Sequence, residues 1–251
     1  MKKYLKAFCM CFSMFCAIPT PFMHVWDASL RGIMLTMFPF VGIVTGLLWS
    51  LLGFLLCKLG CPVFLTAAIL AMFPYLVTGG MHLDGYMDCC DAIFSRRDLE
   101  RRREILKDSH VGSFAVVGLA MLFLFSFAVF ASVKENANFF ILLIVSVVSR
   151  ACSALGITLL KPMDHSEYAG DFHKSICFTN VVIIGSTLVI AVLAGMIFLG
   201  WKSLVASVFT MAGYWLSVWY AYKQFDGFSG DVTGFGHTIA ELCGTLAFVL
   251  L

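Results

Sequence analysis

The sequence predicts an all-α fold, a polytopic membrane-embedded bundle of about six to seven transmembrane helices. The 251-residue chain is 61% hydrophobic and only 13% charged, whereas soluble domains are about 45–50% apolar and about 25% charged. Its mean hydropathy is +0.93. Several apolar runs reach the roughly 20 residues that a helix needs to cross a bilayer. We therefore expect one membrane-embedded domain over residues 1–251.

The apolar runs predict the spans in order. They are 33–57, 62–80, 111–133, 138–160, 176–199, 203–222 and 235–251. The last is short for a full span, and Pro39 and Pro74 are expected to kink the first two. Residues 1–20 combine lysines with a short apolar core. We interpret them as an interfacial or half-inserted helix, with a signal peptide as the alternative.

Basic residues predict the orientation, because Lys and Arg gather on the inner side of a membrane. With the N-terminus inside, three segments share the inner face, namely 81–110, 161–175 and 223–234. The outer side receives only Lys58, Lys134 and Lys202, while Arg150 lies within a span. The inner side receives thirteen basic residues: Lys2, Lys3, Lys6, Arg31, Arg96, Arg97, Arg101, Arg102, Arg103, Lys107, Lys161, Lys174 and Lys223.

The stretch 81–110 concentrates acidic residues at the membrane end of a span. Asp84, Asp88 and Asp91 are spaced i, i+4, i+7 and share one helix face. Three neighbouring carboxylates repel one another unless a cation or water screens them. Carboxylates without Cys or His favour a hard cation such as Mg²⁺. His82 lies off this face, so these three aspartates are the predicted metal ligands.

Two interpretations apply to the charges that follow. If 97–107 is a short helix antiparallel to 84–92, Asp108 returns to the acidic cluster and Lys107 becomes available to a phosphate. The residues from Arg96 to Glu104, in contrast, form charge pairs at helical spacing. Such a face is ordinarily solvated, and we adopt that interpretation for them.

Other features of the inner face add candidates. Arg150 lies mid-span, where a charge needs a partner, and either a structural pair with Glu241 or an anionic substrate would supply it. The glycine-rich segment 223–234 contains Gly230 and Asp231, and its backbone could cradle a phosphate or form a plain turn. Segment 161–175 matches no zinc spacing, so its Asp164, His165, Glu167, Asp171 and His173 are interpreted as solvated.

Together these features indicate a metal-dependent site for phosphoryl transfer on a lipophilic or large substrate. The net charge of +2 says nothing about nucleic acid, but no basic stripe is interleaved with stacking aromatics, so we expect no nucleic-acid partner.

The strings "TGGMHLDGYMDCCDAIFS" and "RRREILKDSHVGSFAV" resemble the cobalamin-5′-phosphate synthases, also called adenosylcobinamide-GDP ribazoletransferases. That family reads roughly TGG-hydrophobic-H-L-D-G-x-x-D-x-x-D-G, then a basic helix, then I-M-K-D-S-x-x-G-x-x-G. Leu106, Ala92 and Ala115 depart from it. "FPFVGIVTGLL", "SRACSAL" and "FSGDVTGFGHTIAEL" extend the resemblance over nearly the whole chain, although His237 is not expected there.

The resemblance implies a reaction and a set of roles. Adenosylcobinamide-GDP and α-ribazole, or its 5′-phosphate, would be joined with release of GMP in cobalamin biosynthesis, with Mg²⁺ required. The implied catalytic residues are Asp84, Asp88, Asp91, Asp108 and Lys107. The implied substrate-binding residues are His82, Arg150, Ser229, Gly230 and Asp231.

The resemblance also implies a location and partners. The enzyme would lie in the cytoplasmic (inner) membrane of a bacterium or archaeon, with the lipid bilayer around it and its active site, built on the catalytic loop 81–110, facing the cytoplasm. The sequence leaves open whether the chain forms a homo-oligomer, how many Mg²⁺ ions bind, which residue is the base and which ribazole form is preferred.

Two alternatives are weighed against this function. CDP-alcohol phosphotransferases use D-x-x-D-G-x-x-A-R followed by G-x-x-x-D-x-x-x-D. Gly80, Asp84 and Asp88 satisfy the second half, but no acidic residue lies between Asp27 and Asp84 to supply the first. A cation-coupled transporter would carry its polar residues at mid-membrane, whereas these lie at the inner ends of spans.

Overall fold

The computed structural model describes residues 2–19, 26–134, 137–163, 172 and 175–250, and the part of the chain that it describes contains helices and no strand. The helices are α1 (Lys2–Phe15), η1 (Ala28–Leu30), α2 (Arg31–Lys58), α3 (Val63–Val77), α4 (Met81–Phe94), α5 (Leu99–Ile105), α6 (Ser113–Ala131), α7 (Ile141–Leu159), α9 (Phe178–Leu199), α10 (Trp201–Phe225) and α11 (Gly230–Leu250). The prediction of an all-α membrane bundle is confirmed.

Six helices within the described residues are long and apolar enough to cross a membrane. They are α2 together with η1, α6, α7, α9, α10 and α11. The remaining predicted span, 62–80, is the short helix α3, which ends in a 95° bend before α4. Gly79 and Gly80 make this bend with φ angles of 64° and 78°, a left-handed conformation that glycine adopts without strain. α4 therefore lies across the end of the bundle.

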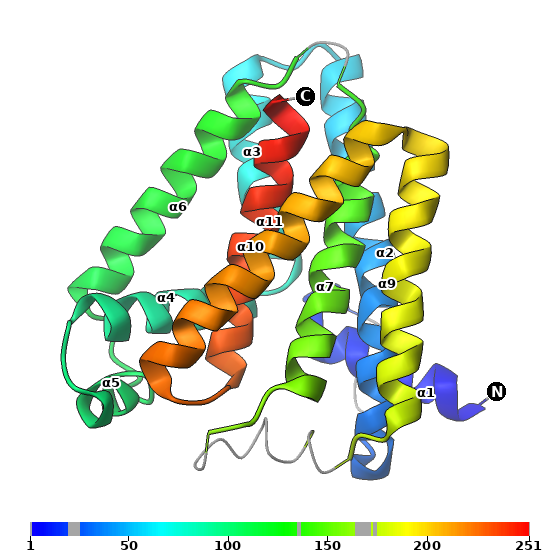
Figure 1. Ribbon diagram of the computed structural model, residues 1–251. Helices are drawn as coiled ribbons and strands as arrows, with labels where there is room; N and C mark the ends of the chain where they lie inside the picture. Colours follow the sequence, from blue (N-terminus) through cyan, green and yellow to red (C-terminus); the bar gives the residue numbers. More distant parts are fainter. Residues whose placement is uncertain (1, 20–25, 135–136, 164–171, 173–174, 251) are drawn as a thin grey trace.

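The three segments predicted to share one face do meet at one end of the bundle (Figure 1). α4 and α5, the α10–α11 turn and the described part of the α7–α9 connection lie at the lower end in this view. The α2–α3, α6–α7 and α9–α10 connections lie at the opposite end. The predicted alternation of spans is therefore correct, and most of the basic residues fall in segments at the lower end.

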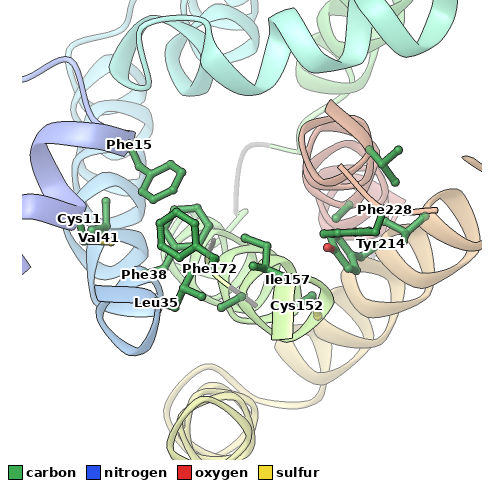
Figure 2. Packing of buried hydrophobic residues seen from close by; sticks show 14 of the residues in the cluster. Cys11, Phe15, Leu35, Phe38, Val41, Cys152, Ile157, Phe172, Tyr214 and Phe228 are labelled. Atoms are coloured by element: carbon green, nitrogen blue, oxygen red, sulfur yellow. The ribbon is translucent and has the colours of Figure 1, made fainter. Parts of the chain in front are cut away.

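The core is organised around α7, whose span is 89% buried, whereas that of α9 is 11% buried. Glycines let α2 approach α7: a Cβ added to Gly42 or Gly46 would lie 2.7 Å from Ser146. Beyond this contact, a cluster of buried apolar side chains extends from Phe15 and Phe38 past α7 to Tyr214 (Figure 2). α7 is thus the central helix, and its polar side chains are buried.

The N-terminal segment forms a helix that packs on the bundle. One face of α1 is buried against α2 and neighbouring helices, and its members are Ala7, Met10, Cys11, Phe12 and Phe15. Lys2 and Lys3 are exposed, and Lys6 forms a 2.9 Å ion pair with Asp27. The apolar side of α1 therefore faces protein, and its interfacial or half-inserted placement stays a prediction.

Candidate functional site

The candidate site is built where α4 crosses α11, and glycines allow this crossing. A Cβ added to Gly85 would lie 2.8 Å from the Cα of Asp231, and one added to Gly234 would lie 3.0 Å from the carbonyl oxygen of His82. The hydroxyl of Thr238 also donates to that carbonyl at 3.3 Å. The backbones of the two helices therefore touch, which places the start of α11 beside the acidic face of α4.

Four carboxylates gather at this crossing. The negative charges of Asp84, Asp231 and Asp91 all act on Asp88, and that of Asp84 also acts on Asp231. Within the described residues, no Lys, Arg or His forms an ion pair with any of the four. The cluster thus carries an excess of negative charge that this part of the chain does not neutralise.

A further element approaches the cluster from the side of α6. Gly112 directly precedes α6, and a Cβ added there would collide with both carboxylate oxygens of Asp91. A larger residue there would require the Asp91 carboxylate to move. The acidic cluster is therefore bordered by the segment that joins α5 to α6 as well as by α4 and α11.

The donors fit a hard cation, although they are not arranged as a finished ligand set. Among the described side chains, no three His, Cys, Asp or Glu residues are placed so that they could hold a metal ion. Mg²⁺, however, commonly takes one or two carboxylates and completes its octahedron with water and phosphate oxygens. The excess of carboxylates at the crossing suits that chemistry. The assignment of Asp84, Asp88 and Asp91 as metal ligands stays a prediction.

Asp108 is turned toward a histidine in this structure. Its Oδ1 accepts hydrogen bonds from the backbone N–H of His110 at 3.0 Å and from the His110 ring at 2.7 Å. These hydrogen bonds hold the pKa of the Asp108 carboxyl below its ordinary value. Lys107, next to it, is exposed. Whether Asp108 joins the acidic cluster and Lys107 contacts a phosphate stays a prediction.

The interpretation of the Arg96–Glu104 stretch as an ordinary solvated face is wrong for two arginines. Arg103 donates from Nε to the carbonyl oxygen of Phe225 at 2.8 Å and from Nη2 to that of Asp226 at 2.9 Å. Arg102 donates from Nη1 to the side chain of Gln224. These partners are 122 and 123 residues away in sequence, so helical spacing could not reveal them.

The α10–α11 turn gives Ser229 a structural role. Its hydroxyl accepts from the N–H of Val232 at 3.2 Å, which makes it the N-cap of α11. The same hydroxyl lies 3.3 Å from an Asp231 carboxylate oxygen. Gly230 and Asp231 form the first turn of α11, where exposed N–H groups favour anions. Substrate binding by Ser229, Gly230 and Asp231 stays a prediction.

A short backbone pairing supports this turn. Phe228 donates its N–H to Lys161 at 3.0 Å and accepts from the N–H of Met163 at 2.9 Å. A Cβ on Gly227 would lie 2.5 Å from the Met163 side chain. Two of the predicted inner-face segments are therefore joined directly. The candidate zinc ligands of segment 161–175 lie outside the described residues.

His82 is a buried residue of α4, on the side of the helix away from the acidic face. Its ring is 4% exposed and lies 4.2 Å from that of His237 and 6.0 Å from those of Phe15 and Phe38. Its Nε2 has no hydrogen-bond partner among the described residues. The expectation that His82 is not on the carboxylate face is confirmed, whereas a role in substrate binding stays a prediction.

Arg150 forms the structural pair that was one of its two interpretations. Its Nη1 donates to Glu241 at 2.9 Å and to the carbonyl and hydroxyl oxygens of Ser146 at 3.1 Å and 2.6 Å. His237 adds to this group, with Nε2 3.3 Å from the same Glu241 oxygen and Nδ1 3.1 Å from the Ser153 hydroxyl. Sequence reasoning missed His237, although its i, i+4 spacing to Glu241 was a signal.

The fold and site define a class: polytopic helical membrane proteins with an unneutralised acidic cluster at one end of the bundle. A model of the family described as cobalamin-5-phosphate synthase matches residues 7–249. This chain therefore belongs to the cobalamin-5-phosphate synthase family, as the resemblance predicted.

Individual relatives match this chain over nearly their full length. The chain is 34% identical over 247 residues to an adenosylcobinamide-GDP ribazoletransferase of Clostridium perfringens (strain SM101 / Type A), which covers 98% of each chain. It is 33% identical over 252 residues to one of Clostridium botulinum (strain Alaska E43 / Type E3), covering 100% of this chain and 99% of the relative. It is 29% identical over 250 residues to one of Listeria monocytogenes, covering 98% of each. No solved structure gives a significant match.

Proposed function

We propose that this protein is an adenosylcobinamide-GDP ribazoletransferase. It joins adenosylcobinamide-GDP to α-ribazole, or to α-ribazole 5′-phosphate, and releases GMP. The product is adenosylcobalamin or its 5′-phosphate, in the late nucleotide-loop assembly step of cobalamin biosynthesis. The observation that carries the proposal is the family match over residues 7–249, together with relatives of that name matched end to end.

The chemistry is a phosphoryl transfer. A ribazole hydroxyl attacks a phosphorus of the pyrophosphate link, the bond from that phosphorus to the bridging oxygen breaks, and GMP leaves with the electron pair. The hydroxyl proton passes to a base, for which Asp108 is a candidate because its carboxylate is exposed. Bound Mg²⁺ would neutralise phosphate charge and orient the pyrophosphate.

The roles divide among the elements that meet at the crossing. Asp84, Asp88 and Asp91 would hold Mg²⁺, while Asp231 lines the site at the start of α11. Lys107 is exposed and suited to phosphate charge. Arg150 is engaged by Glu241 and Ser146, so we assign the phosphate role to Lys107 in preference to Arg150.

The orientation follows from charge. The end that carries the acidic cluster also carries most of the lysines and arginines, and such segments stay in the cytoplasm. We place the chain in the cytoplasmic membrane of a bacterium with the site facing inward. The partners are then the two substrates and the bilayer, and the oligomeric state is open.

Enzyme assays with membranes test the proposal. Membranes that contain the protein are incubated with adenosylcobinamide-GDP, α-ribazole and Mg²⁺, and we expect GMP and a corrinoid product with the nucleotide loop attached. Membranes without the protein serve as control. Neither product, together with release of CMP from CDP-diacylglycerol, would instead support the phospholipid synthase alternative, which the family match does not favour.

A further inference from the structure

We propose that Arg103, assisted by Arg102, is a positioning residue that holds Asp231 in the acidic site. The two side chains, here called the arginine clamp, fasten α5 to the C-terminal end of α10. The role in catalysis rests on the proposed function, because it concerns turnover by the same site.

The geometry of the clamp is specific. The guanidinium of Arg103 bridges two successive carbonyl oxygens, those of Phe225 and Asp226, with two separate N–H groups. Carbonyls at the end of a helix have no partner within the helix and carry partial negative charge. A charged donor therefore suits them, and charge-assisted bonds are stronger than neutral ones. The Arg103 side chain is 27% exposed, so it is partly shielded from water.

The clamp links the two parts of the chain that carry the acidic cluster, α4 and the start of α11. On one side, α5 begins five residues after α4 ends, and α4 carries Asp88. On the other side, Asp231 follows Asp226 by five residues. Asp226 itself has a φ of 49°, so the chain reverses sharply at the clamped carbonyl. The clamp therefore fixes where this turn begins, and with it where α11 starts.

A second set of contacts between these two parts of the chain lies where α4 crosses α11. There, a Cβ added to Gly85 would lie 2.8 Å from the Cα of Asp231, and the hydroxyl of Thr238 donates to the carbonyl oxygen of His82 at 3.3 Å. These contacts hold α4 against α11 along the helices. The clamp adds an attachment at the turn before α11, outside the site itself.

A substrate-binding role for Arg103 would require different geometry. Its Nε and Nη2 are both engaged with backbone carbonyls, whereas an arginine that recognises phosphate presents its donors to the ligand. Arg97, in contrast, is exposed, and its side chain makes no hydrogen bond or ion pair within the described part of the chain. It offers a matched control of the same residue type and charge.

The test compares Arg103→Gln, Arg103→Lys and Arg97→Gln in the full-length protein. Steady-state kinetics gives kcat and KM, and hydrogen–deuterium exchange follows the peptide over residues 225–233. We expect Arg103→Gln to lower kcat about tenfold with little change in KM, because small misplacements of a catalytic group are costly. Exchange in 225–233 should rise in the same variant. Arg103→Lys should be intermediate because it keeps the charge but lacks the planar guanidinium that reaches two carbonyls with two nitrogens, and Arg97→Gln should match the wild type.

Three results would overturn the inference. Wild-type exchange in Arg103→Gln would show that the turn does not depend on the clamp. A lower kcat with unchanged exchange would place Arg103 at the substrate instead. Faster exchange throughout the chain would assign it a general role in stability. An inactive wild-type protein would count against the proposed function alone, because the exchange comparison still decides whether the clamp holds the turn.

Discussion

Two groups of charged residues share α11, and their charges are balanced in different ways. In the middle of the bundle, Glu241 meets Arg150 at 2.9 Å, and both are at most 6% exposed. At the end of the bundle, Asp231 meets Asp84 and Asp88, and no basic residue within the described ranges pairs with them. In the first group, the acidic and basic side chains pair within the chain. In the second group, no basic partner is present among the described residues.

The difference separates structure from function. Removing one partner of a buried ion pair leaves an uncompensated charge and is strongly destabilising. The stability of the bundle therefore depends on both Arg150 and Glu241. A half-exposed carboxylate cluster gains nothing for stability from its mutual repulsion. The proposed function gives this cluster a role, because a cationic ligand and an anionic substrate would balance its charge there. Variants in the two groups should therefore affect different measurements.

The largest effect is expected for Asp88→Asn. The change keeps the shape of the side chain and removes the charge on which the other three carboxylates act. Turnover should fall about 10³-fold or more, because a metal-held phosphate accounts for several kcal/mol of the barrier. Membrane insertion and thermal unfolding in detergent should be unchanged or slightly improved. Glu100→Gln, an exposed acid on α5, is the control, and wild-type turnover in Asp88→Asn would remove Asp88 from the metal site.

The next effect concerns the buried pair. Arg150→Met should destabilise the bundle by about 3–5 kcal/mol, because the buried Glu241 carboxylate loses its arginine partner. The double variant Arg150→Met/Glu241→Leu should recover most of this loss. Thermal unfolding of both proteins in the same detergent measures it. If the double variant regains stability but remains inactive, Arg150 has the substrate role that we assign to Lys107.

A smaller effect is expected where the two helices cross. Gly85→Ala places a methyl group 2.8 Å from the Cα of Asp231, and overpacking of this kind costs about 1–3 kcal/mol. Turnover should fall as α4 and α11 separate. Gly185→Ala on α9 has open space around the added Cβ and should be neutral or stabilising. Equal behaviour of the two variants in thermal unfolding and activity would argue against a tight crossing.

The smallest effect is expected at the cap of α11. Ser229→Ala removes the acceptor for the Val232 N–H, and loss of an N-cap costs about 1 kcal/mol. Ser229→Thr should restore the cap. If Ser229 only caps the helix, KM for adenosylcobinamide-GDP will be the same in both variants. A raised KM in Ser229→Ala that threonine does not correct would indicate direct contact with substrate.

Much of the fold could be predicted because the bilayer imposes length and hydropathy on each span. The exceptions have local causes. Segment 62–80 contains Gly79 and Gly80, which turn the chain before a full span is complete. The final helix starts at Gly230 instead of 235, because its glycine-rich first turn resembles a loop in sequence and only the Ser229 cap shows that it is helical.

The site was predictable as a set of residue types and not as a set of contacts. The spacing of Asp84, Asp88 and Asp91 indicated one helix face without tertiary information. That Asp231 lies beside them depends on the absence of a side chain at Gly85, which has no meaning until the partner helix is known. The arginine clamp was hidden for the same reason, since a solvated helix face and a clamp have identical spacing.

The position of Glu241 along α11 has a consequence for where the site lies relative to the middle of the bundle. Ten residues separate it from Asp231, which is about 15 Å along a helix axis. The bond to Arg150 prevents α11 from sliding along its own length. The buried Arg150–Glu241 pair thus fixes the position of α11 along its axis. Because the helix is rigid, the pair also fixes the distance between itself and the Asp231 carboxylate.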